Sequence, residues 1–101
     1  MYANGQGVLQ DYAEAVHLYR RAAEQGYANS QNNLETMYAN GHGVLKSDVL
    51  AHMWFNIASA NGGEEAPANR DNAENRMTRD EIAEAQALAR LCMSSGYQDC
   101  D

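Results

Sequence analysis

Apolar side chains recur along the chain every three or four residues, the spacing that places them on one face of an α-helix. Two such stripes are Ala15, Leu18, Tyr19 and Ala22, and Ala51, Trp54, Phe55 and Ala58. Farther along, Thr78 followed by Glu81 has the spacing of a capping box, which marks the start of a last helix. The pattern predicts five helices, over residues 11–25, 28–39, 48–60, 67–75 and 79–92.

Two stretches of the chain share one sequence pattern. Residues 1–26 laid on residues 37–62 give 11 identities in 26 positions without a gap, at a period of 36. In each unit a helix is expected to start at an N-cap, Asp11 or Ser47. The loop before the second one contains Gly41 and Gly43, because glycine adopts tight-turn backbone angles at little cost. Since each unit can bury its stripe only against its neighbours, the repeat predicts stacked helical hairpins.

The composition changes this picture in one respect. The 17 alanines against six valines and isoleucines favour an all-α fold, but Leu, Ile, Val and Phe together make only 14 residues. Stability must then come from many contacts between closely packed helices, which alanine permits. The net charge of -7 disfavours a nucleic-acid partner, and no apolar run is long enough to predict a membrane span.

The repeated segments MYANGQGV, AEQGYANSQNNL and MYANGHGV resemble the Sel-one-like repeat, a relative of the tetratricopeptide repeat. The segment NRMTRDEIAEAQALAR resembles the closing helix pair of bacterial members of that family. This resemblance implies an all-α right-handed α/α superhelix of about two and a half repeats over residues 1–92, with a tail over 93–101. It also implies an adaptor or scaffold function. Two departures are Glu35, where the family usually has glycine, and Leu18, where it often has tryptophan.

The first unit lacks the first helix of its hairpin, because Met1 and Tyr2 match only the last turn of that helix. We therefore expect Leu18 and Tyr19 to be without intrachain cover at an open end of the stack. Covering about 400 Å² of apolar surface contributes on the order of 10 kcal/mol, before ordering and association costs are subtracted. A homo-oligomer through this end is expected, unless the chain is a piece of a longer array.

A set of polar side chains is predicted to face away from the hairpin partner and to bind a protein or peptide. These residues are Asn29, Asn32, Asn33, Thr36, Asn69 and Asn72. The asparagine side chain offers a donor and an acceptor, which suits a peptide backbone. For any single one of them, plain solvent-facing polar surface is the alternative interpretation.

No constellation of residues predicts chemistry. The histidines His17, His42 and His52 lack the spacing of a metal site, and no HExxH or CxxC motif is present. The serines have no predicted base or oxyanion pocket nearby. Trp54 and Phe55 lie on the apolar stripe, which favours core packing over a ligand site. We expect no catalytic residue, metal or cofactor.

Cys92 and Cys100 are the two cysteines, and a Ser-Ser-Gly turn between them can fold the tail back onto the last helix. Closing that ring would stabilise the fold by roughly 2.5 kcal/mol in the chain-entropy model. A bridged pair indicates a periplasmic or secreted protein, whereas two thiols indicate the cytoplasm.

The function that the sequence favours is a non-enzymatic protein-interaction module or adaptor that holds its partner on a concave helical face. Two alternatives remain. Some cysteine-rich secreted members of the resembled family bind or hydrolyse β-lactam antibiotics, although this chain has few cysteines and no Ser-x-x-Lys motif. The other alternative is that the chain is a purely structural, self-associating cap of a longer repeat array.

Overall fold

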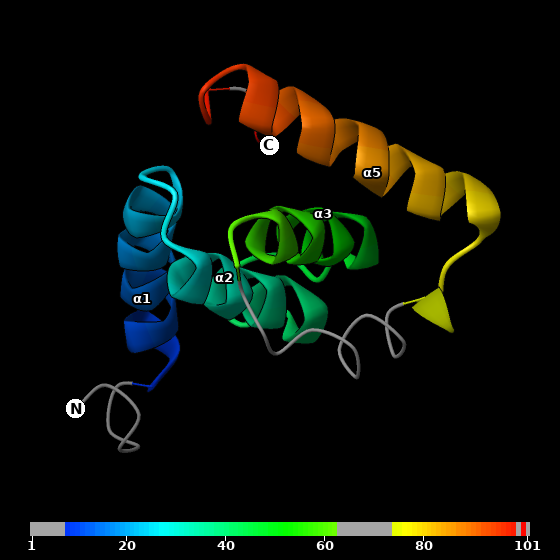
Figure 1. Ribbon diagram of the computed structural model, residues 1–101. Helices are drawn as coiled ribbons and strands as arrows, with labels where there is room; N and C mark the ends of the chain where they lie inside the picture. Colours follow the sequence, from blue (N-terminus) through cyan, green and yellow to red (C-terminus); the bar gives the residue numbers. More distant parts are fainter. Residues whose placement is uncertain (1–7, 63–73, 99, 101) are drawn as a thin grey trace.

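The computed structural model describes residues 8–62, 74–98 and 100, and this part of the chain contains four α-helices and no strand (Figure 1). The helices are α1 (Val8–Ala23), α2 (Ala28–Asn40), α3 (Asp48–Ala60) and α5 (Arg79–Ser94). The predicted all-α class is confirmed. Most of the predicted helix over residues 67–75 lies outside the described residues.

The helices stack in chain order. α2 and α3 form a helical hairpin, α1 packs against α2, and α5 packs against α3. As a result α3 lies between α2 and α5, whereas α1 lies at the edge of the molecule (Figure 1). Each helix rests mainly on its sequence neighbours, which is the arrangement of a repeat solenoid.

Capping residues define where two of the helices begin. The Ser47 hydroxyl accepts a hydrogen bond of 3.1 Å from the Leu50 amide at the start of α3. At the start of α5, Thr78 and Glu81 form both bonds of a capping box, at 2.9 and 3.1 Å. These signals act within one helical turn, so the sequence alone locates them.

The predicted start of α1 is wrong. The helix begins at Val8, so Asp11 lies in the first turn and is not the N-cap. An acidic side chain is favourable at either position, because the positive end of the helix dipole extends over the first turn. The presence of an aspartate at position 11 therefore does not determine at which residue α1 begins. The opposite end also differs, since α1 ends at Ala23, two residues before the predicted Gln25.

The core lies along α3 and the facing side of α2. Trp54, Met53 and Ile57 of α3 and Leu34 of α2 are all fully buried. Because α2 and α5 cover α3 on two sides, seven residues of α3 are buried, more than one apolar stripe would supply. The buried Nε1 atom of Trp54 has no hydrogen-bond partner among the described residues.

Two polar contacts hold the segment before α5 against α3. Arg76 donates two hydrogen bonds to the Asp48 carboxylate, at 3.0 and 3.4 Å. His52 is buried, and its Nε2 lies 2.7 Å from the Glu74 carboxylate. The Asn56 amide nitrogen lies 3.0 Å from Nδ1 of the same ring, so Nδ1 accepts and Nε2 carries the proton donated to Glu74.

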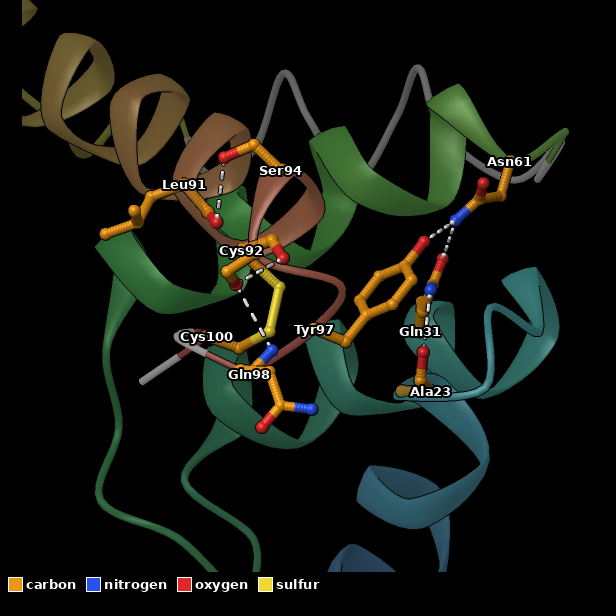
Figure 2. Close-up of a disulfide and its surroundings, with 10 residues drawn as sticks. Ala23, Gln31, Asn61, Leu91, Cys92, Ser94, Tyr97, Gln98 and Cys100 are labelled. Carbon is orange, nitrogen blue, oxygen red and sulfur yellow. Dashed lines mark hydrogen bonds between the residues drawn. A yellow bond between two sulfur atoms is a disulfide. The ribbon is translucent and has the colours of Figure 1, made fainter.

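A disulfide joins Cys92 at the end of α5 to Cys100 (Figure 2). The chain turns back through Gly96 and Tyr97, both of which have positive φ angles. The Tyr97 amide closes the helix end by donating to the Cys92 carbonyl at 2.8 Å. The bridge and the turn together fix the tail beside the end of α5.

Tyr97 belongs to a hydrogen-bonded chain that connects the tail with the other helices (Figure 2). The side-chain Nδ2 of Asn61, just after α3, donates to the Tyr97 hydroxyl at 2.9 Å and to the side-chain Oε1 of Gln31 at 3.0 Å. Gln31, fully buried on α2, donates in turn to the carbonyl of Ala23 at 3.0 Å. Polar groups from four segments are therefore satisfied by one another, which fixes their relative positions.

Candidate protein-binding surface

One face of α2 is exposed and consists of small polar side chains. Its members are Asn29, Asn33, Thr36 and Asn40. They are spaced by four, three and four residues, which places them in a row along the helix. The opposite face, with Gln31, Leu34 and Tyr38, is buried, so core packing sets the orientation of the polar row.

The polar row carries no formal charge. Glu35 is the one charged residue of α2, and it is 4% exposed. Neither the first nor the last turn of α2 adds an acidic or a basic side chain. The Thr36 hydroxyl donates to the Asn32 carbonyl at 3.2 Å. The three asparagines of the row, Asn29, Asn33 and Asn40, are exposed. This surface can therefore make hydrogen bonds without selecting for the charge of a partner.

Not all of the predicted binding residues lie in the row. Asn29, Asn33 and Thr36 do, but Asn32 is only 7% exposed, so its assignment to an open binding face is corrected. Asn32 is buried because α1 and α3 both pack against α2, and the covered arc is wider than the apolar stripe alone. The sequence reasoning missed Asn40, whose spacing of four from Thr36 is a signal that was available.

The remaining predicted binding residues, Asn69 and Asn72, lie outside the described residues. Of the candidate surface, the structure therefore describes only the part on α2.

The second candidate surface is on α1. Leu18 is 49% exposed, as expected, but Tyr19 is partly buried and packs against the core, so the expectation that Tyr19 lacks intrachain cover is wrong. The repeat places Trp54 of α3 at the position equivalent to Leu18, and Trp54 is fully buried. Equivalent positions thus differ in burial because α3 has a helix on each side, whereas α1 packs mainly on α2.

The histidines are separated from one another. His17 is exposed on α1, His42 stacks on the Tyr12 ring with centroids 4.5 Å apart, and His52 pairs with Glu74. Within the described residues, no group of three or more histidine, cysteine, aspartate or glutamate side chains is placed to hold a metal ion.

The segments that match a known protein family coincide with the helices of the structure. A model of the Sel1 repeat matches residues 1–27 and 28–63. The chain belongs to the Sel1 repeat family. The second Sel1 match contains the complete α2–α3 hairpin, and the first contains α1. The predicted family is therefore confirmed, and Sel1 repeats generally serve as protein–protein interaction modules.

One curated relative is the exopolysaccharide production negative regulator of Rhizobium leguminosarum bv. viciae. It is 39% identical over 70 residues, which are 69% of this Sel1 chain and 24% of the relative. The chain thus spans about a quarter of the relative's length. No solved structure matches the chain. In the part of the chain that the structure describes, no helix has the length and apolar character needed to cross a membrane.

Proposed function

We propose that this Sel1-repeat chain is a protein-binding module that holds an extended peptide segment of its partner along α2. The observation that carries the proposal is the uncharged polar row formed by Asn29, Asn33, Thr36 and Asn40. Asparagine offers both a donor and an acceptor to a peptide group, so it can hydrogen-bond to a main chain whatever the side chains of that peptide are.

The dimensions of the row support an extended ligand. Four residues of an α-helix rise about 6 Å, so Asn29 and Asn33, like Thr36 and Asn40, are separated by about that distance along the helix axis. Alternate residues of an extended chain repeat at about 6.6 Å. Each of these two pairs can therefore meet two successive outward-facing peptide groups on one edge of the ligand, whereas the three-residue step from Asn33 to Thr36, about 4.5 Å, is shorter than the repeat of the ligand.

The relative is named as a negative regulator, and a regulator can act by occupying a partner without catalysing a reaction. We extend this mode of action to the present chain. Since the row itself is uncharged, peptide shape and backbone hydrogen bonding contribute most of the recognition, and salt has little effect on binding.

The test begins with selection of random 12-residue peptides, displayed on phage, against the immobilised protein. The affinity of the selected peptides is then measured by fluorescence anisotropy for the wild type and for the double variant Asn29→Arg/Asn33→Arg. We expect at least tenfold weaker binding by the variant, because two long charged side chains obstruct the row.

Gln86→Arg is the matched control, because Gln86 is exposed on α5, far along the chain from the row, and the substitution adds the same side chain. Circular dichroism should show unchanged melting for all variants. A failure to select any peptide, or equal binding by the wild type and the double variant, would rule out α2 as the binding surface.

A further inference from the structure

We infer that the exposed flank of α1 is a docking surface for a second copy of this chain, with the two α1 helices packed antiparallel around Leu18. This inference goes beyond the proposed peptide-binding function and uses a different helix. It rests on the internal repeat and on the distribution of charge along α1.

The internal repeat allows this flank of α1 to be compared with the equivalent face of α3. Ala15, Leu18 and Ala22 occupy the positions that Ala51, Trp54 and Ala58 occupy one repeat later. The three residues of α3 are at most 1% exposed, under neighbouring helices. Their counterparts on α1 are partly or largely exposed. This flank therefore has the composition of a surface that packs against a helix. Among the described residues, however, no helix covers it.

The charges of α1 favour a second α1 as the occupant. The acidic side chain of the first turn is Asp11, and the basic side chains of the last turn are Arg20 and Arg21. Glu14 and Arg21 are exposed and stand four residues before and three residues after Leu18. In an antiparallel pair centred on Leu18, Glu14 of each copy lies beside Arg21 of the other, whereas a parallel pair would place identical residues at the same level and would bring no Glu14 beside an Arg21.

The symmetry of this arrangement sets its size and its stoichiometry. An antiparallel pair of identical helices has a two-fold axis, so the same surface is used twice and the assembly stops at a dimer. Two faces of about 400 Å² bury roughly 800 Å² in total, about half of a standard stable interface. The dimer should therefore be weak and concentration-dependent, with a dissociation constant above about 1 μM.

Sedimentation equilibrium from about 5 to 500 μM tests the inference on the whole chain at neutral pH. The wild type should change from monomer to dimer over this range. Leu18→Glu should abolish the dimer, whereas Leu91→Glu should leave it unchanged. The control is closely matched, because Leu91 on α5 is 48% exposed and Leu18 is 49% exposed.

Charge reversal tests the antiparallel geometry. Glu14→Arg and Arg21→Glu should each weaken the dimer at least tenfold, and an equimolar mixture of the two single variants should form a heterodimer with both ion pairs restored. The double variant should associate like the wild type. Circular dichroism verifies that every variant is folded.

Three results would overturn the inference. The first is a wild type that stays monomeric at every concentration, which would mean that another segment or another protein covers this flank of α1. The second is a dimer that Leu91→Glu disrupts and Leu18→Glu does not. The third is a dimer that both single charge reversals leave intact.

Discussion

Gly43 lies so close to α1 that a Cβ atom at this position would be 2.6 Å from the carbonyl oxygen of Tyr12. The φ angle of Gly43 is +78°, a region that glycine alone adopts easily. Beside it, the ring of His42 stacks on the ring of Tyr12. The loop between α2 and α3 thus packs against α1, and glycine is required both by the backbone angle and by the lack of space.

Gly43→Ala should lower the free energy of unfolding by at least about 2 kcal/mol, since it adds a clash with backbone to an unfavourable φ angle. Gly62→Ala is the control, because Gly62 has a φ of +92° and no atom lies within 4 Å of the place that an added methyl group would occupy. That variant should lose only about 1 kcal/mol. Urea unfolding followed by circular dichroism measures both, and equal losses would show that the close approach to Tyr12 is unimportant.

Trp54 and Leu18, which are one repeat apart, should respond very differently to truncation. Trp54→Ala removes a fully buried side chain and should lower the free energy of unfolding by about 3–5 kcal/mol. Leu18→Ala should lower it by less than about 1 kcal/mol, because half of that side chain is already exposed. Unfolding at low micromolar concentration, where the proposed dimer dissociates, gives both values. Similar losses would contradict the end position of α1.

Reduction of the Cys92–Cys100 bridge should destabilise the fold by roughly 2–3 kcal/mol, because the bridge closes a ring with a sequence separation of 8. The measurement is thermal unfolding with and without a phosphine reductant. In the Cys92→Ser/Cys100→Ser variant the reductant should have no effect. An unchanged melting temperature of the reduced wild type would show that the tail stays in place without the bridge.

The Cys92–Cys100 bridge should determine how much Tyr97 contributes to the free energy of unfolding. In the oxidised protein, Tyr97→Phe removes the hydrogen bond from Asn61 and should lower the free energy of unfolding by about 1 kcal/mol. In the reduced protein the substitution should have little effect, because the tail is no longer held beside Asn61. Urea unfolding of both proteins in both redox states gives the coupling. A cost of equal size in both states would mean that the bridge and the hydrogen bond act independently.

The Asp48–Arg76 pair should make stability depend on pH. The hydrogen bonds from Arg76 hold the pKa of Asp48 below its ordinary value of 3.8, partly opposed by burial of the carboxyl group. A lowered folded-state pKa means that the pair stabilises the protein above about pH 4 and that this contribution is lost as the pH falls through the folded-state value.

Asp48→Asn should therefore cost up to about 1 kcal/mol at pH 7 and progressively less below pH 4, since the pair is partly exposed. Asp48 also places a negative charge at the start of α3, so the variant Arg76→Gln, which keeps that charge and removes only the ion pair, is needed as well. It should remove the same pH-dependent part of the stability. Urea unfolding between pH 2.5 and 7 measures both variants. A cost that stays constant across this range would exclude the ion pair as its source.

The elements that were predicted well depend on short-range interactions. The starts of α3 and α5 follow from Ser47 and from the Thr78–Glu81 box, whose bonds span three residues. The end of α2 was predicted to within one residue, and α3 was predicted at both ends. The α1 boundaries were less accurate, because Asp11 suits both an N-cap and a first turn.

The candidate surface was predicted only in part, because it depends on what covers each side of a helix. Asn32 and Asn33 are neighbours in sequence and chemically identical, yet Asn32 is buried and Asn33 is exposed. The difference arises from the packing of α1 and α3 against α2, which residues distant in sequence decide. Gln31 also looks like a surface residue, and its full burial depends on acceptors and donors from Ala23 and Asn61.

The sequence by itself determined the helices, their period of 36 residues and the stripes that pack, since propensity, spacing and capping act within a turn or two of the chain. Tertiary structure alone decided that Trp54 is enclosed while Leu18 is half exposed, and that Gly43 meets the backbone of Tyr12. These outcomes depend on how neighbouring helices stack, because burial and close contact are properties of pairs of segments, whereas the repeat gives each segment the same local preference.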